Sequence, residues 1–590
     1  MAYSDNFPAQ RPVFMADFAN GGRIDPRATF TRASTANVWD GSKHLSSENL
    51  FTYSTPPNGW TLDSFTLTSG QTAPDGSTNA AKLTEDTSGS EHRIYPYSSV
   101  TTSGGSTTLS GYFKYIGRQW VMFRLNDGTN YRRVWFDIQN GALGSAETGI
   151  THSITASGNG YYKCVATIAT SNTSYLPTIG GAPANTGITY TGSGADAFYV
   201  WGLQYNNNVG SVLSETSGQI HREYAPSLVS KANNVGRFDH TTDGQSMGIL
   251  IEGQATNLYG NSLDMTGVAG TRTNIDSNVA VGPTGELTAD ALRLNGTDSN
   301  THYREYSFTA AASTTYTFSV YLKAAGLSHA AIRSNNLFST EYVYFNLSNG
   351  TVEGSPSMSN SMTAVGNGFY RCSVTATTTG SGAASFVIYI TDSATSTIVA
   401  TGDSYRAILG QAIQIESGSH PSSFIETSGG STATRAVESL SVSVSDLGLT
   451  SGQDVSIITE ANWGDPTDNP YNRFALALAT DGNNRIAFYN NNGQNGSGWV
   501  RYSGSDSAFF NPGTTSGGYA KLGISAAMNS FNYAFNGTAG TEDTAGVVPE
   551  YSELEIGSNG IGTQQLDGHV KRVAVYGEAL SDTNLQALTS

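Results

Sequence analysis

The chain has 590 residues, of which 13% are charged and 11% aromatic, and its formal net charge is −17. This length exceeds what one hydrophobic core supports and predicts three or four domains. An acidic surface repels phosphate backbones, so the charge argues against a nucleic-acid-binding protein. The 67 glycines and 31 tyrosines favour many short strands joined by turns.

The N-terminal region predicts strands rather than a targeting segment. The opening MAYSDNFPAQRP has no apolar centre, and no run in the chain approaches the length of a membrane span. We therefore expect synthesis in a cytoplasm and no membrane insertion. Residues 12–18 resemble a strand, and residues 236–252 a hairpin. We expect residues 1–48 and 206–256 to form one small split β unit.

The middle of the chain contains one module twice. Gly158–Cys164 (GNGYYKC) returns as Gly366–Cys372 (GNGFYRC), 208 residues later, and Asn49-Leu50-Phe51 returns as Asn257-Leu258-Tyr259 at the same offset. Such matches indicate an internal duplication, with modules at residues 49–205 and 257–428. Because Cys164 and Cys372 occupy equivalent positions, we interpret both as buried apolar residues rather than a disulfide.

Both modules predict an all-β fold. Strand-like runs recur about every ten residues between Gly, Ser and Asn breaks, which favours a sandwich or jelly roll. Asn126-Asp127-Gly128 predicts a hairpin turn. Each module resembles the jelly-roll carbohydrate-binding modules of glycanases and phage fibres.

Residues 437–590 predict a further sandwich. Strands are expected at residues 455–461, 473–479, 485–489, 521–524 and 532–535, the last followed by an Asn536-Gly537 turn. Residues 566–588 (LDGHVKRVAVYGEALSDTNLQAL) resemble the last strand and closing helix of concanavalin A-like or laminin-G-like domains. Ser581 is expected to cap that helix.

Several motifs resemble a family of phage virion proteins that comprises tail fibres, head fibres and spikes. They are Phe30–Thr35 (FTRAST), the GRFDH of residues 236–240, and Gly248–Leu258 (GILIEGQATNL). Gly236 stands where the family has proline, and Gln254-Ala255 where it has a charged pair. The resemblance implies a virion surface location, other virion proteins as partners, a trimer, and an N-terminal virion anchor.

One strand in each module predicts a ligand face. Val134, Phe136 and Ile138 alternate with polar and aromatic residues, and Val343, Phe345 and Leu347 do the same in the second copy. An aromatic ring among hydrogen-bonding groups on an open sheet suits sugar binding. The alternative is a packing face. The candidate glycan-binding residues are Trp120, Arg133, Trp135, Asp137, Tyr342, Tyr344 and Asn346.

Motifs of catalysis and metal binding are absent from the sequence. It has no HExxH, GxSxG or GxxxxGK[ST] pattern and no paired histidines at metal spacing. No cofactor is expected, and the one alternative is a calcium site in acidic loops such as Asp465–Asp468. Glu553 and Glu555 should share one face of a strand, either as a local carboxylate pair or as part of a solvated strand.

The sequence thus predicts a non-enzymatic phage surface protein that displays glycan-binding modules to a host surface glycan. The alternatives are a decoration (cement) protein without a ligand and a polysaccharide depolymerase. Repeated, oligomeric display would raise the avidity of weak sugar sites.

Overall fold

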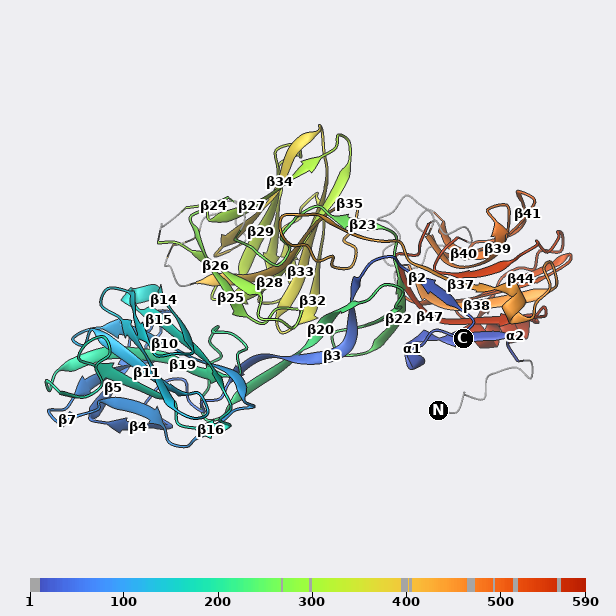
Figure 1. Ribbon diagram of the computed structural model, residues 1–590. Helices are drawn as coiled ribbons and strands as arrows, with labels where there is room; N and C mark the ends of the chain where they lie inside the picture. Colours follow the sequence, from blue (N-terminus) through green and yellow to red (C-terminus); the bar gives the residue numbers. More distant parts are fainter. Residues whose placement is uncertain are drawn as a thin grey trace.

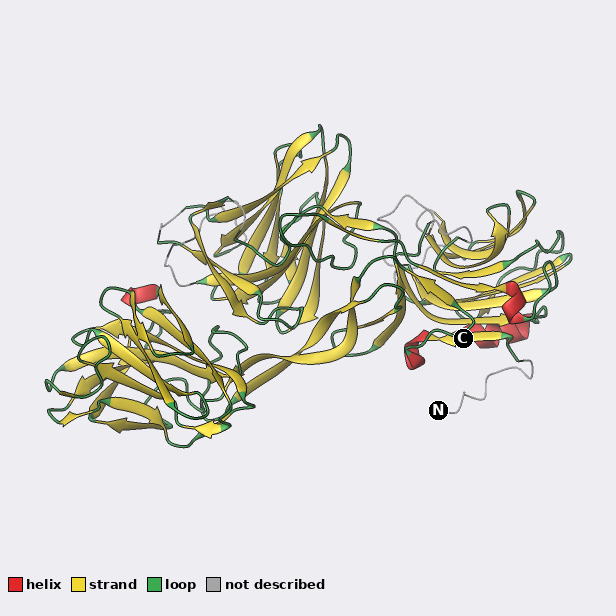
Figure 2. Cartoon of the chain, in the orientation of Figure 1, coloured by secondary structure: helices red, strands yellow, loops and turns green. Residues whose placement is uncertain are grey.

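The computed structural model describes residues 11–590 except 267–268, 297–299, 394–399, 401, 403–405, 464–472, 492–493, 513–517 and 560–563. Nearly all of the ordered secondary structure is strand (Figure 2). Three sandwiches follow one another in space: module 1, module 2 and a C-terminal sandwich (Figure 1). The all-β fold class expected from the sequence is confirmed.

Module 1 is a sandwich of two six-stranded antiparallel sheets. The first has the order β14 (Ile150–Ala156), β15 (Tyr162–Thr170), β10 (Gly105–Tyr115), β19 (Asp196–Asn206), β6 (Ala80–Glu85), β5 (Phe65–Gln71). The second has the order β13 (Ala142–Ala146), β12 (Tyr131–Asp137), β11 (Trp120–Asn126), β17 (Thr178–Ala182), β8 (Arg93–Pro96), β4 (Trp60–Asp63). Short pairs at its rim are β9 (Val100–Thr101) with β16 (Ser174–Tyr175), and β7 (Gly89–Ser90) with β18 (Tyr190–Thr191).

Module 2 repeats this strand order. Its first sheet runs β32 (Ser359–Gly366), β33 (Phe369–Thr377), β28 (Thr315–Ala325), β35 (Ala407–Ser417), β26 (Ala289–Leu294), β25 (Thr273–Ala280). Its second runs β31 (Thr351–Glu353), β30 (Tyr342–Asn346), β29 (His329–Asn335), β34 (Gly382–Thr391), β27 (Tyr303–Ala310), β24 (Gly270–Thr271). The repeated motifs therefore occupy equivalent strands. Cys164 and Cys372 are both free and buried, as expected.

Each module has a buried asparagine, at equivalent positions, that hydrogen-bonds its first residues to its last strand. Asn49 donates to the carbonyls of Leu203 and Ser214 and accepts from the backbone of Phe51 and Tyr205. Asn257 makes the equivalent four bonds, to residues 413, 425, 259 and 415. The duplicated Asn-Leu-aromatic motif thus ties the start of each module to its last strand and to the segment after it.

The C-terminal sandwich takes strands from distant parts of the chain. One sheet has the order β21 (Arg237–His240), β22 (Ser246–Ile251), β47 (Gly568–Tyr576), β38 (Val455–Asn462), β43 (Ala520–Ala527), β44 (Ser530–Phe535), β45 (Thr538–Ala539), with β1 (Phe14–Asp17) also on β47. The other has the order β2 (Thr29–Thr31), β37 (Ser439–Ser443), β46 (Glu553–Ile556), β39 (Arg473–Asp481), β40 (Asn484–Asn491), β41 (Gln494–Tyr502), β42 (Ser505–Phe510). Helix α2 (Asp582–Thr589) begins after Ser581, whose side chain accepts from the Asn584 N–H, as predicted.

The split N-terminal unit expected from the sequence does not exist as a separate body. Strands β1, β2, β21 and β22, with the short helix α1 (Phe18–Gly21), join the C-terminal sandwich, and Phe14, Phe30 and Ile249 lie in its core. The expected hairpin of residues 236–252 is confirmed as β21–β22. Alone, these segments expose apolar faces that only the larger sandwich buries.

A long two-stranded ribbon connects module 1 to the rest of the molecule. Strands β3 (Ala36–Asn49) and β20 (His221–Lys231) pair along their length and lie between module 1 and the C-terminal sandwich (Figure 1). A shorter pair, β23 (Ala255–Asn257) with β36 (Ala433–Arg435), forms the entry and exit of module 2. Module 1 is therefore inserted through the ribbon, and module 2 through the short pair.

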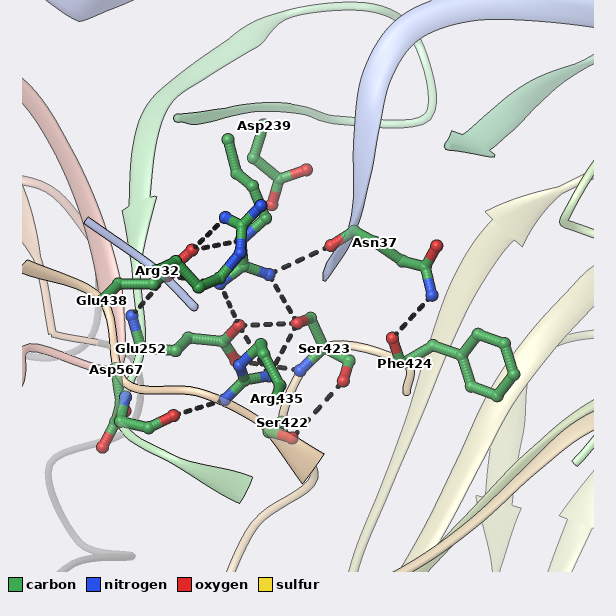
Figure 3. Close-up of polar contacts among 12 residues, drawn as sticks. Arg32, Asn37, Asp239, Glu252, Ser422, Ser423, Phe424, Arg435, Glu438 and Asp567 are labelled. Carbon is green, nitrogen blue, oxygen red and sulfur yellow. Dashed lines mark hydrogen bonds and ion pairs between the residues drawn. The ribbon is translucent and has the colours of Figure 1, made fainter. Parts of the chain in front are cut away.

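A buried ion cluster stands where the ribbon, module 2 and the C-terminal sandwich meet (Figure 3). Glu438 accepts from Arg32 at 2.8 Å and from Arg237 at 2.8 and 2.5 Å. Glu252 pairs with Arg237 at 2.6 Å and Arg435 at 3.0 Å. Arg32, Arg237 and Glu252 belong to the FTRAST, GRFDH and GILIE motifs, so these motifs meet in one structural junction.

The junction also binds the chain that leaves module 2. Arg237 donates to the hydroxyl of Ser423 and to the carbonyl of Asn37. Burial opposes ionisation of Glu252, but Arg435 and Arg237 lower the pKa of its carboxyl well below its usual range. The charges therefore stay ionised and fix how module 2 joins its neighbours.

Candidate functional site

The alternation predicted for the two equivalent strands is confirmed. On β12, Val134 and Phe136 lie in the core of module 1, and on β30, Val343 and Phe345 lie in the core of module 2. Because neighbouring residues of a strand point to opposite faces, the residues between them lie on the outer face of the sheet. This outer face is where the glycan site was expected.

In module 1 that face is closed. Trp135 is 3% exposed, and it packs against Ala182 and Ile188. Its indole Nε1 donates to the carbonyl of Gly187 at 2.8 Å. The prediction of an open ring at Trp135 is therefore wrong, because the segment after β17 covers it. An indole enclosed in this way has no free face for a sugar.

Trp120 and Arg133 lie at the margins of the same closed face. Trp120 is half-buried and packs on the cluster around Trp135. Arg133 is half-buried and lies 3.4 Å from the Glu147 carboxylate. The structure thus brings these predicted residues together around a packed indole rather than an open ring.

Asp137 and Asn346 stabilise turns and lie 6% and 8% exposed, respectively. Asp137 accepts from the backbone of Gln139 and Asn140, and Asn346 accepts from Ser348. The prediction that these two residues bind sugar hydroxyls is wrong. Each is the last residue of its strand, and its side chain is used by the turn that comes next.

Module 2 carries a row of aromatic rings on the equivalent face. Ring centroids are 5.0 Å apart for Tyr303 and Tyr389, 5.5 Å for Tyr389 and Tyr342, and 6.4 Å for Tyr342 and Tyr344. Tyr303, Tyr342 and Tyr344 are half-buried and Tyr389 is buried. The Arg333 guanidinium lies 5.4 Å from the Tyr342 ring and donates to the Tyr389 hydroxyl at 3.1 Å. We call these five residues the tyrosine face.

Two carboxylates flank the tyrosine face. Glu305 lies opposite Val387 on the neighbouring strand and accepts from Ser385 and Asn335. Glu353 lies opposite Tyr344 and accepts from Asn346 at 2.7 Å. A carboxylate has about four lone-pair positions, so both retain capacity to accept from hydroxyl groups.

The protonation state of the face suits neutral ligands. Burial raises the pKa of Tyr344 and of Tyr389 above the ordinary tyrosine value, so both hydroxyls remain protonated donors at neutral pH.

The outer side of the other sheet of module 2 packs against the ribbon through residues such as Leu228 and Phe369. The tyrosine face therefore lies on the side of the sandwich opposite the ribbon.

Sequence reasoning found Tyr342 and Tyr344 but missed Tyr303, Arg333 and Tyr389. These three come from neighbouring strands, and a single strand pattern does not show which strands are adjacent. The alternation in residues 385–391 (SFVIYIT) indicates Tyr389, because it places this side chain on the other face of the strand from the apolar Phe386 and Ile388.

The carboxylate pair Glu553 and Glu555 shares one face of β46, as expected, because Leu554 and Ile556 face the core. Glu555 is buried at 6% exposure and is hydrogen-bonded by Ser558, so it does not belong to a solvated strand. Burial raises the pKa of the Glu555 carboxyl, and Glu553 adds to this.

Within the described residues, no three His, Cys, Asp or Glu side chains are grouped so that they could hold a metal ion. The acidic loop Asp465–Asp468 lies outside the described residues. Over the same described part of the chain, no helix is long and apolar enough to cross a membrane.

Comparisons with known proteins give only distant likenesses. No protein family matches the chain, and no curated protein matches it. The tandem CBM22 domains of Xyn10C from Paenibacillus barcinonensis align with 65% of this chain and 100% of that chain, at 12% identity and a TM-score of 0.19. The CBM40 of a Ruminococcus gnavus IT-sialidase aligns with 24% of this chain and 84% of its own, at 12% identity and a TM-score of 0.20.

A third structure is similar to the same limited degree. Domain 4 of an extracellular arabinanase from Geobacillus stearothermophilus, solved with arabinotriose, aligns with 28% of this chain and 84% of that domain, at 15% identity and a TM-score of 0.19. Likenesses of this strength carry no ligand or activity over to this chain.

Proposed function

We propose that this protein is a non-enzymatic glycan-binding protein and that the tyrosine face of module 2 is its binding site. The observation that carries the proposal is the continuous row of tyrosine rings beside Arg333, Glu305 and Glu353. Rings stack on the C–H face of a pyranose, while charged groups at the margin bond its hydroxyls. Such a shallow site binds weakly and suits multivalent display.

We further propose that the protein is displayed on a bacteriophage particle as a tail fibre, head fibre or spike. The support is the resemblance of the FTRAST, GRFDH and GILIEGQATNL motifs to virion proteins. It is made in the bacterial cytoplasm and assembles, as a trimer in this proposal, with other virion proteins. The host surface glycan is its external partner.

The binding site is tested with the full-length chain on a glycan array and by titration of the best hit. The double variant Tyr342→Ala/Tyr344→Ala should lose affinity at least about tenfold, because each ring removed takes away a stacking surface. Tyr224→Ala, on the ribbon, is the matched control because this tyrosine is 59% exposed and away from the face. Unchanged binding by the folded double variant would disprove the site.

The particle location is tested separately by cryo-electron microscopy of virions that carry this chain. An outward-facing module 2 on a fibre, spike or head projection is the expected result. A tyrosine face buried against capsid or sister subunits would instead make this a decoration protein without a glycan ligand.

Glu553 and Glu555 favour a second candidate, hydrolysis of a host polysaccharide. Glycoside hydrolases use a carboxylic acid of raised pKa beside a second carboxylate, and burial raises the pKa of Glu555 next to Glu553. Release of reducing ends from host polysaccharide, lost in Glu555→Gln, would establish this activity.

A further inference from the structure

A cavity of about 440 Å³ lies between module 1 and module 2. Its module 1 wall includes Tyr112 and Lys163, and its module 2 wall includes Arg293, Lys323 and Phe369. This size falls in the range of small-molecule sites. The cavity lies on the ribbon side of module 2, so it is distinct from the tyrosine face.

The two walls are joined by backbone contacts. Gly210 forms a β-bridge to Ala280, and the Ser211 N–H donates to the carbonyl of Val279 at 2.9 Å. Farther along the rim, Arg293 Nη1 lies 3.4 Å from the carbonyl of Ala156. The first two contacts connect the segment after β19 with β25, and the third connects β14 with β26. The cavity therefore belongs to the folded arrangement of the two modules.

Two lysines on the cavity wall have no carboxylate within ion-pair distance among the described residues. Lys163 Nζ donates to the Ser211 hydroxyl at 3.1 Å and lies 5.8 Å from the Tyr112 ring. Lys323 Nζ donates to the Asn367 side chain at 3.0 Å. An ammonium group has three donors, so each lysine keeps donors for a ligand. A largely buried ammonium group without a carboxylate partner is unfavourable for folding unless a bound anion pairs with it.

The module 2 equivalent of Lys163 has hydrogen-bond acceptors within its own part of the chain. Arg371 occupies the equivalent position in GNGFYRC, stacks on Tyr321 at 5.6 Å, and donates to Ser319 and to the carbonyl of Ser422. In module 2 the chain itself therefore supplies the acceptors. In module 1 the equivalent side chain, Lys163, lines the cavity instead.

We propose that this cavity binds a carboxylate-bearing molecule of about monosaccharide size, with the carboxylate between Lys163 and Lys323. Five carboxylates also line the cavity, namely Glu48, Asp75, Glu215, Glu223 and Asp276, and of these Glu48 pairs with Arg222 and Asp276 with Arg293. A single negative charge therefore fits better than a phosphate dianion. Tyr112 and Phe369 contact the body of the ligand. Because its walls come from both modules, the bound ligand holds module 1 against module 2. This site stands independently of the tyrosine face.

The binding should weaken in alkali. Burial lowers the pKa of Lys163 to about 8, an effect that Asp276 opposes and Arg293 reinforces. Burial also lowers the pKa of Lys323, which Glu223 opposes. The groups that face Lys163 are Tyr112 on β10, Ser211 after β19, Asp276 on β25 and Arg293 on β26. As pH rises through about 8, Lys163 loses its proton, and the attraction for a carboxylate falls.

The test is calorimetric titration of the full-length protein with glucuronate, glucose and inorganic phosphate. We expect glucuronate to bind, glucose to bind at least about tenfold more weakly, and glucuronate affinity to fall above about pH 8. Lys163→Met and Lys323→Met should each reduce glucuronate affinity about tenfold or more. Binding of phosphate alone, or no binding of glucuronate, would overturn the proposal.

Lys114→Met is the matched control. Lys114 is the module 1 equivalent of Lys323, but it lies over Tyr161 and Tyr199 and not on the cavity wall. This variant should bind glucuronate as the parent does. The double variant Tyr342→Ala/Tyr344→Ala should also keep glucuronate binding in the cavity, which separates this site from the proposed glycan face. Equal losses in Lys114→Met and Lys163→Met would refute the assignment.

Discussion

Module 1 and module 2 share an internal framework but differ in what their surfaces can do. Both have the same strand order, the same buried asparagine and the same buried cysteine. On the outer face of the equivalent sheet, Trp135 is sealed by the segment after β17, whereas Tyr342 and Tyr344 stay half-exposed. Duplication thus preserved the core, and the loops and outer residues diverged.

The modules also differ in how they are attached. Module 2 meets the C-terminal sandwich at the buried cluster of Arg237, Glu252 and Glu438, whereas module 1 extends on the ribbon β3–β20 and contacts module 2 around the cavity. Charge buried with full pairing fixes one geometry strongly. The contact between module 1 and module 2 surrounds a cavity with charged lining residues, so we expect it to separate more easily than the junction.

The largest expected effect comes from breaking the junction. Glu438→Gln leaves Arg32 and Arg237 without the carboxylate they share, which should destabilise the molecule by about 3–5 kcal/mol. Scanning calorimetry should show the loss in the transition that includes module 2 and the C-terminal sandwich, with the transition of module 1 unchanged. Asp196→Asn, in an exposed pair with Lys82, is the control and should leave all transitions nearly unchanged.

If Glu438→Gln lowered the unfolding temperature of every transition equally, this cluster would not stabilise module 2 in preference to module 1.

A somewhat smaller effect is expected from opening the closed face. Trp135→Ala removes a buried indole and should cost module 1 about 3 kcal/mol or more in unfolding free energy. Tyr344→Ala should cost module 2 less, because that ring is already half-exposed. Unfolding by denaturant, followed separately for each module, checks this difference.

If Trp135→Ala abolished glycan binding without loss of stability, the contrast between a packed and an open face would be wrong.

The smallest expected effect comes from removing the buried asparagine that the two modules share. Asn49→Ala and Asn257→Ala each leave several buried backbone groups unpaired and should each cost about 2 kcal/mol. The two sites lie in different modules, so the double variant should show the sum of both effects. Chemical denaturation of the single and double variants measures this.

Unequal costs would show that the two modules do not depend on this asparagine in the same way.

The sequence alone determined the period-two alternation and the internal duplication. Alternation identified Val134, Phe136, Val343 and Phe345 as core residues, because side chains of a strand alternate between faces whatever the strand's neighbours are. It also predicted the helix capped by Ser581, since a cap acts within one turn of chain. These are local rules, and the structure follows them.

Only the tertiary structure decided what covers each outer face and which distant residues meet. Trp135 and Tyr344 have similar sequence surroundings, and only the segment after β17 makes the first a packing residue. Arg32 and Glu438 lie 406 positions apart, yet they form one buried pair. The physical reason is that burial and charge pairing depend on distances between strands, which the order of residues along one strand does not contain.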